Sequence, residues 1–246
     1  MPLVGLGTWR LNGDRGREAV AHALRAGYRH VDTATSYGNE ADVGHALRDS
    51  GIPREQVFVT TKLPPDRAGR ERTTIEESLR ALGVDHVDLW LVHWPPQGAA
   101  QPQTWEQMLS ARDDGLARAV GVSNYSTAQV DELVDATGEA PAVNQVPWGP
   151  SRYDARLLRE HRDRGVVVEG YSPLKNARLD DPAVIAATEA HGVTPEQVAL
   201  RWHVQHGVVV IPKSATPERI ERNLDLFGFT LDDDEMSRID GLSTRR

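Results

Sequence analysis

Eight short apolar segments recur along the chain, and helix-like amphipathic stretches separate them. The apolar segments are nearly continuous rather than alternating, which is typical of strands buried on both faces. They span residues 3–8, 28–32, 57–62, 87–93, 117–123, 142–146, 166–172 and 207–212. This alternation predicts parallel strands joined by helices.

The stretches between the apolar segments carry helix boundary signals. Helices are expected over residues 17–27, 39–51, 73–83, 104–115, 126–138, 154–165, 194–207 and 216–224. The first three close on a glycine, the third also opens on a threonine cap, and the last two open on Thr-Pro. The pattern predicts an α/β fold, a single (β/α)8 TIM barrel over residues 1–246. A doubly wound sheet is the alternative, but no G-x-G-x-x-G follows the first strand.

Composition excludes several classes of function. The net charge is −8, and its acidic residues are dispersed, so no basic surface for nucleic acid or membrane is expected. The absence of cysteine excludes disulfides and thiolate metal sites. His203 and His206 lack an evident third ligand, so no metal is assigned. No run approaches a membrane span of roughly 20 residues, and no signal peptide is evident, so a cytoplasmic protein is expected.

Four polar residues fall at or just beyond the ends of predicted strands, where TIM barrels carry their active sites. They are Asp32, Tyr37, Lys62 and His93. Taken singly, each has an ordinary structural explanation, such as a cap, a solvated amine or a buried core histidine. Together they suit carbonyl reduction. Lys62, held by Asp32, would lower the pKa of Tyr37 so that it acts as a general acid, and a neutral His93 would stabilise an oxyanion.

Several motifs resemble those of the aldo-keto reductase family, in particular its bacterial, diketogluconate reductase-like members. They are GLGTWR, YRHVDTATSYGNE, VFVTTKL, VDLWLVHWP, AVGVSNY, EGYSPL and VVVIPKSATPERIERNL. The resemblance implies that Asp32, Tyr37, Lys62 and His93 form a catalytic tetrad. It also implies a monomeric, NADP-dependent oxidoreductase acting on CH–OH groups, which reduces aldehydes and ketones with NADPH.

A cationic segment follows the last predicted strand. Lys213, Ser214 and Arg219 lead into a helix, and cations with amides at a helix N-terminus bind anions. Both cations could instead be solvated residues at the start of the helix. The resemblance implies that these three residues hold the 2′-phosphate of NADPH and that Asn223 contacts the adenine. Arg222 stands where many members have glutamate, which puts one adenine hydrogen bond in doubt.

The resemblance also assigns the nicotinamide end of the cofactor. It places Ser123, Asn124 and Gln145 on the carboxamide, Tyr171 against the ring, Ser172 and Leu174 along the pyrophosphate, and Gly7, Thr8 and Asp32 nearby. From the residues alone, Tyr171 could be a core aromatic, and Ser123 and Asn124 could cap the following helix.

The expected substrate is a small carbonyl compound in an aromatic pocket. Trp9, Trp94 and Tyr125 resemble pocket walls, with Tyr37 and His93 at the reacting carbonyl. Gly149 stands where many members have histidine, so this loop is expected to differ. The chain also lacks the family's N-terminal hairpin and extended C-terminal loop, which suggests an open pocket.

Three other interpretations stay open at this stage. An NADPH-binding sensor or channel-associated subunit could share the fold and the tetrad. A barrel aldolase could use Lys62 as a Schiff-base nucleophile. The short ends could also leave a degraded enzyme.

Overall fold

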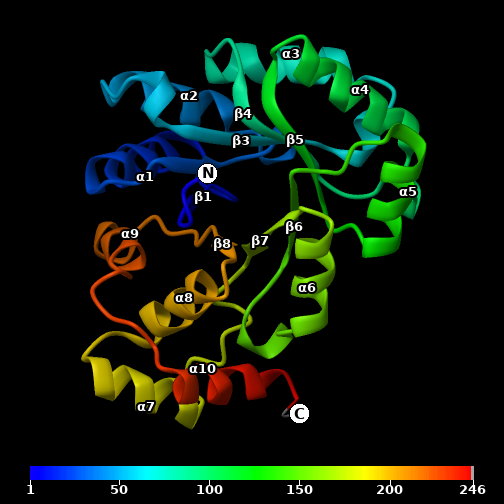
Figure 1. Ribbon diagram of the computed structural model, residues 1–246. Coiled ribbons are helices and arrows are strands. Elements are labelled where there is room, and N and C mark those ends of the chain that lie inside the picture. The colour runs from blue at the N-terminus through cyan, green and yellow to red at the C-terminus, as the bar shows by residue number, and fades with distance from the viewer. Residues whose placement is uncertain (245–246) are drawn as a thin grey trace.

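The computed structural model describes residues 1–244, and its centre is one parallel sheet (Figure 1). Within that range eight strands pair in sequence order. They are β1 Leu6–Gly7, β2 His30–Asp32, β3 Phe58–Leu63, β4 Val87–Val92, β5 Ala117–Ser123, β6 Val143–Pro147, β7 Val167–Tyr171 and β8 Val209–Val210. A parallel bridge between Val4 and Val210 joins the two ends of the sheet. The predicted TIM barrel is therefore confirmed, and the doubly wound alternative is wrong.

Helices lie outside the sheet and connect successive strands (Figure 1). Eight correspond to predicted ones: α1 Gly13–Ala26, α2 Glu40–Asp49, α3 Glu71–Leu82, α4 Pro102–Asp113, α5 Thr127–Thr137, α6 Ala155–Asp163, α8 Pro195–Gln205 and α9 Pro217–Leu224. Short 3₁₀ segments span Thr35–Tyr37, Arg54–Gln56, Pro65–Arg67, Pro96–Gly98, Pro150–Arg152 and Gly241–Ser243. None of the helices described in residues 1–244 is both long and apolar enough to cross a membrane.

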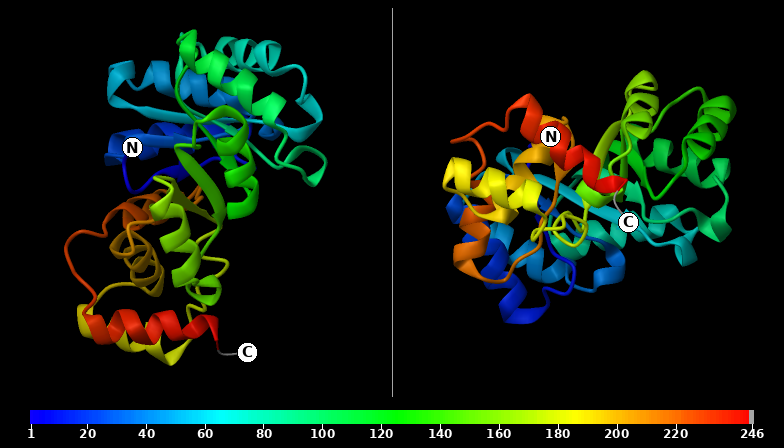
Figure 2. Two further views of the ribbon diagram at one scale, coloured as in Figure 1. Left: turned by 45° about the vertical axis from the view of Figure 1, so that its right-hand side comes forward. Right: turned by 90° about the horizontal axis from the view of Figure 1, so that it is seen from below.

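Two helices were not predicted, α7 Pro182–His191 and α10 Asp233–Asp240, and they lie side by side (Figure 2). The side chain of Asp232 caps α10 by accepting from the Glu235 N–H, and Glu235 in turn pairs with His191 of α7. The acidic run at residues 232–234 therefore caps and starts a helix.

The predicted threonine cap of α3 is wrong. The helix begins two residues earlier, at Glu71, and Thr74 lies inside it with its hydroxyl donating to the Arg70 carbonyl. Glu71 is buried and accepts from the Gly69 N–H and from the Thr104 hydroxyl of α4. The helix start is thus fixed by a tertiary contact that no local signal reveals.

The apolar core lies mainly between the strands and the helices. Trp90 of β4 joins a large buried cluster that includes Leu24 of α1 and Ile75 of α3. Its neighbours Leu89 and Leu91 belong to a separate small cluster, as the alternating pleat of a strand requires. The inner face of the barrel is therefore free to carry polar side chains toward the carboxyl ends of the strands.

Candidate active site

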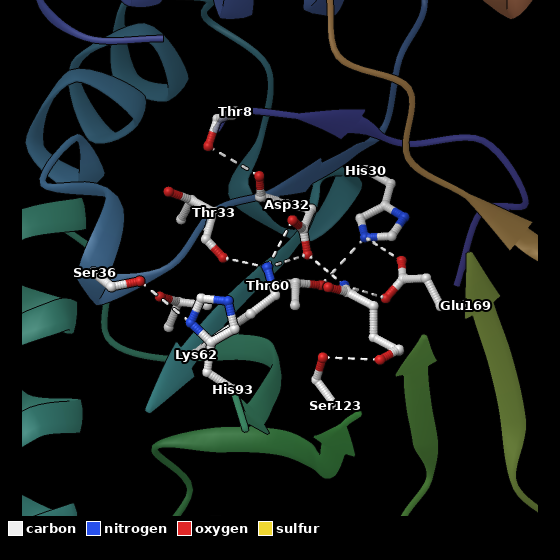
Figure 3. A network of polar contacts seen from close by, with 12 residues as sticks. Thr8, His30, Asp32, Thr33, Ser36, Thr60, Lys62, His93, Ser123 and Glu169 are labelled. Carbon is white, nitrogen blue, oxygen red and sulfur yellow. Dashed lines mark hydrogen bonds and ion pairs between the residues drawn. The ribbon is translucent and has the colours of Figure 1, made fainter. Parts of the chain in front are cut away.

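The four predicted tetrad residues come from neighbouring strand ends. Asp32 is the last residue of β2, Tyr37 ends the 3₁₀ turn that follows, and Lys62 lies near the end of β3. His93 comes directly after β4, and its N–H donates to the Leu63 carbonyl at 2.9 Å. Because parallel strands end on one side, the structure brings all four to one mouth of the barrel, and Figure 3 shows Asp32, Lys62 and His93 there.

Lys62 and Asp32 form a buried ion pair. The Lys62 ammonium donates to both carboxylate oxygens of Asp32 at 2.7 and 2.8 Å and to the Thr33 carbonyl at 2.8 Å, so all three protons are used. Burial lowers the pKa of Lys62, but the charge and hydrogen bonds of Asp32 outweigh it and the net pKa is raised. A Schiff-base nucleophile must be a neutral amine, so this environment argues against the aldolase interpretation.

Tyr37 lies beside both Lys62 and His93. Its ring centroid is 5.2 Å from the Lys62 nitrogen and 5.7 Å from the His93 ring. Burial raises the pKa of Tyr37, while the charge of Lys62 opposes that effect. The predicted influence of Lys62 is confirmed in direction, but the expected net lowering is wrong because burial is larger. The phenol therefore keeps its proton at neutral pH, as a proton donor must.

His93 is held as a neutral imidazole. Burial, and then the positive charge of Lys62, lower the pKa of His93 to about 4. Its Nδ1 lies 3.2 Å from the hydroxyl oxygen of Ser36, which no sequence motif indicated. Among residues 1–244, no protein group bonds to the other ring nitrogen, which stays available for a ligand.

A cavity of about 440 Å³ opens over these residues. Its lining includes the predicted residues Gly7, Thr8, Trp9, Asp32, Tyr37, His93, Trp94, Ser123, Asn124, Gln145, Tyr171, Ser172 and Lys213. Ser36, Pro173 and Ile211 also line it and were missed. Tyr125 does not line this cavity, because it is buried with its hydroxyl on the Ala100 carbonyl, and it lines a neighbouring pocket with Trp94 instead.

The residues expected at the carboxamide form a connected set. Asn124 donates to the Ser123 hydroxyl at 2.9 Å and to the His93 carbonyl at 3.1 Å, and it accepts from the Tyr171 hydroxyl at 2.9 Å. Its backbone is left-handed, with φ of 65°, which is uncommon for a residue other than glycine. The helix-cap explanation is wrong, because Ser126 caps α5. Tyr171 is only partly buried, so it is not a core aromatic.

A second cavity, of about 430 Å³, is lined by the other predicted cofactor residues. These are Leu174, Lys213, Ser214, Arg219 and Asn223, and Arg15, Thr194, Glu196, Ala215, Thr216 and Arg222 complete the lining. Lys213 lines both cavities, so the two adjoin. Within the described chain, none of the four cations here (Arg15, Lys213, Arg219, Arg222) is ion-paired. This cavity therefore suits an anionic group.

One more carboxylate lies in the barrel beneath the first cavity. Glu169 of β7 is fully buried, and its Oε2 accepts from the Gln145 side-chain nitrogen at 2.8 Å (Figure 3). The same nitrogen donates to Asp32 at 2.8 Å. Burial, and then the negative charge of Asp32, raise the pKa of Glu169 to about 8. The available signal was a lone glutamate within the apolar run VVVEGYS.

These shifts predict how stability depends on pH. Burial lowers the pKa of His30, His93 and His203 to about 4, from 6.5, and raises that of Glu169 to about 8, from 4.5. Between pH 4.5 and 6.5, unfolding takes up three protons at these histidines and releases one from Glu169. Their joint contribution to the unfolding free energy therefore falls as pH drops below 6.5, and the Glu169 contribution falls as pH rises from 6.5 to 8.

Urea unfolding across this pH range measures the effect, at about 1.4 kcal/mol per pH unit for each net proton. Glu169→Gln is expected to remove the loss of unfolding free energy between pH 6.5 and 8. The loss of unfolding free energy below pH 6.5 should remain. An identical alkaline slope in this variant would contradict the assignment to Glu169.

Comparison with known proteins identifies relatives of this architecture. The model of the aldo/keto reductase family matches residues 3–244. An aldo-keto reductase of Mycolicibacterium smegmatis is 44% identical over 98% of this chain and 87% of its own length. Morphine 6-dehydrogenase of Pseudomonas putida is 43% identical over 99% and 88%. The crystal structure of a Bombyx mori aldo-keto reductase in complex with NADP superposes with a TM-score of 0.91, at 34% identity, over 100% of this chain and 91% of that one.

Proposed function

The chain belongs to the aldo/keto reductase family, and we propose that it reduces a small aldehyde or ketone to the alcohol with NADPH. The observation that carries this proposal is the position of Tyr37, which lines the cavity beside His93 and the buried Lys62–Asp32 pair. An oxidoreductase of this kind needs a proton donor and an oxyanion site next to a bound hydride donor.

The two adjoining cavities fit an extended dinucleotide phosphate. The four unpaired cations would receive the 2′-phosphate, with Ser214 beside them and Asn223 on the adenine side. Ser172 lines the first cavity and Leu174 lines the second, and the pyrophosphate is expected to pass along both residues. When bound, NADPH supplies the hydride that the carbonyl carbon accepts.

At the other end, polar groups would orient the nicotinamide. Ser123, Asn124 and Gln145 would contact its carboxamide, and the ring of Tyr171 would cover one face. The left-handed backbone at Asn124 is held by side-chain bonds on both its amide atoms, so this group is preorganised. Gly7 and Thr8 complete the wall beside Asp32, where the Thr8 hydroxyl donates to the Asp32 carbonyl at 2.9 Å.

The tetrad would then act on the substrate oxygen. The Tyr37 hydroxyl gives its proton to that oxygen as negative charge develops, and the adjacent Lys62 charge stabilises the phenolate left behind. The free ring nitrogen of His93 donates a hydrogen bond to the same oxygen. Asp32 holds Lys62 in place.

The substrate pocket is open and aromatic. Trp9 and Trp94 line the cavity and are 52% and 49% exposed, so both can pack against an apolar group. Small aromatic or aliphatic aldehydes, keto acids and sugar-derived carbonyls all suit it. Gly149 packs against Asn176, and a Cβ added at Gly149 would lie 2.8 Å from the Asn176 Cβ. The loop therefore has no room for a histidine at this position.

The direct test is NADPH consumption with a panel of these carbonyl compounds. Oxidation of NADPH with at least one of them, in proportion to alcohol formed, is the expected result. Tight NADPH binding with no carbonyl reduced across the panel would overturn the reductase proposal and favour the sensor interpretation.

Lys213, which lines both cavities, is expected to favour NADPH over NADH. Lys213→Met is expected to weaken NADPH binding by roughly 10–100-fold, because a charge-assisted contact to the phosphate is lost. NADH lacks that phosphate, so its affinity should change much less. Cofactor affinity measured by fluorescence titration gives both numbers. An equal loss for NADPH and NADH would contradict a role in 2′-phosphate recognition.

A further inference from the structure

The Gln145 side chain is held from two sides by carboxyl groups. Gln145 and Glu169 are direct partners across β6 and β7. The Gln145 nitrogen donates one proton to Asp32 Oδ2 and the other to Glu169 Oε2, each at 2.8 Å. An amide nitrogen has only two protons, so this end of the side chain is fully used.

That arrangement determines which end of Gln145 faces the ligand. Gln145 lines the cavity, whereas Glu169 is fully buried and does not reach it. With the nitrogen turned inward, the carbonyl oxygen is the group presented to the cavity. One hydrogen bond to Asp32 would let the amide swing, whereas a second bond at Glu169 fixes its plane.

We propose that Glu169 is a positioning residue, which fixes the Gln145 amide so that its carbonyl accepts a hydrogen bond from the nicotinamide carboxamide. The inference rests on the proposed function, since it requires NADPH in the first cavity. According to this inference, the cofactor site also requires the buried side chain of Glu169, which is not one of the four tetrad residues.

The surroundings of Glu169 favour its neutral form. Among the described residues, Lys62 is the buried cation near Glu169, and it is already paired with Asp32. His30 lies with Nε2 3.6 Å from Glu169 Oε1 and 3.2 Å from the Thr60 hydroxyl, and Glu169 Oε1 has no hydrogen-bond partner in the described chain. A neutral carboxyl still accepts at Oε2, so glutamine at this position can replace it without loss of the bond.

The experiment compares three ligands on the native chain and on a set of variants. NADP⁺ carries the carboxamide, its 3-acetylpyridine analogue has no N–H on that group, and adenosine 2′,5′-bisphosphate has no nicotinamide. Their dissociation constants are measured by calorimetry on the native chain, Glu169→Leu, Glu169→Gln and Gln145→Met. The native chain is expected to prefer NADP⁺ over the acetyl analogue by about tenfold, the value of one hydrogen bond.

Glu169→Leu is expected to reduce this preference to near unity, as Gln145→Met does, while Glu169→Gln retains it. The double variant Gln145→Met/Glu169→Leu should show no further loss, because both changes remove the same contact. Bisphosphate affinity should be equal in all of them, which also verifies folding. If the leucine variant fails that check, Glu169→Met provides the same comparison.

Full discrimination in a folded Glu169→Leu or Glu169→Met variant would overturn the inference. So would a loss in Glu169→Gln as large as in Glu169→Leu, since it would indicate a requirement for the carboxyl group itself. Failure of the native chain to bind NADP⁺ would instead reject the proposed cofactor, and the inference with it. A failure of the inference appears only in the Glu169 variants, whereas a failure of the proposed cofactor appears already in the native chain. The two failures are therefore distinguishable.

Discussion

Replacing Tyr37 with phenylalanine is expected to lower the rate of carbonyl reduction by about 10²–10⁴-fold, the usual contribution of a positioned general acid. The substitution removes one oxygen and keeps the ring that packs 5.7 Å from the His93 ring. Burial raises the pKa of this phenol, so the native side chain is protonated across the neutral range and ready to donate. The hydroxyls of Ser36 and Tyr171 also line the cavity, but they contact His93 and Asn124.

Single-turnover oxidation of bound NADPH measures this effect without interference from product release. Tyr171→Phe is the matched control, because it removes a phenol oxygen from the same cavity wall. That oxygen donates to Asn124, so the control should alter NADPH affinity more than the hydride-transfer rate. An undiminished rate in Tyr37→Phe would transfer the proton-donor role to another group, and His93 would be the next candidate.

The strand pattern allowed the barrel to be predicted because parallel strands buried on both faces need continuous apolar runs. The exact ends of the strands were harder to predict from the sequence. β1 and β8 pair over only two residues each, although their apolar runs are six residues long. Pairing depends on how far neighbouring strands run alongside one another, and a single run does not contain that information.

Helices α7 and α10 illustrate signals that were present but misjudged. Asp181 followed by Pro182 is a cap and a first-turn proline, the same signal that predicted α8 and α9 from Thr-Pro. A barrel needs one helix between strands, so the second helix between β7 and β8 went unexpected. Asp232 and Glu235 form a capping box at the start of α10, which is also a local helix signal.

The candidate site was predictable in position and less so in electrostatics. Strand ends placed Asp32, Tyr37, Lys62 and His93 on one mouth because the fold's geometry does so for any parallel barrel. The net pKa shift of Tyr37 depends on how much water the surrounding loops exclude, which sequence spacing does not give. Glu169 escaped selection because its partners Gln145 and His30 lie on other strands, β6 and β2, and are far from it in the sequence.

Lys62→Met is expected to destabilise the fold by about 3–5 kcal/mol, because removing one partner leaves the other as an uncompensated buried charge. Asp32 is 1% exposed, and Lys62 donates to both of its oxygens. After the substitution, the Asp32 carboxylate keeps only the bond from the Gln145 side chain among the described residues. Methionine is similar in length and apolar, so the loss comes mainly from the charge rather than from an empty space.

Urea unfolding at constant pH measures the change against two controls. Arg156→Ala breaks the Arg156–Glu160 pair, whose arginine is 79% exposed, and should cost under about 1 kcal/mol because water screens that pair. The double variant Asp32→Asn/Lys62→Met removes both buried charges and should recover part of the lost stability, while carbonyl reduction stays impaired. A double variant that is less stable than Lys62→Met alone would mean that Asp32 contributes through Gln145 and the backbone rather than through its pairing with Lys62.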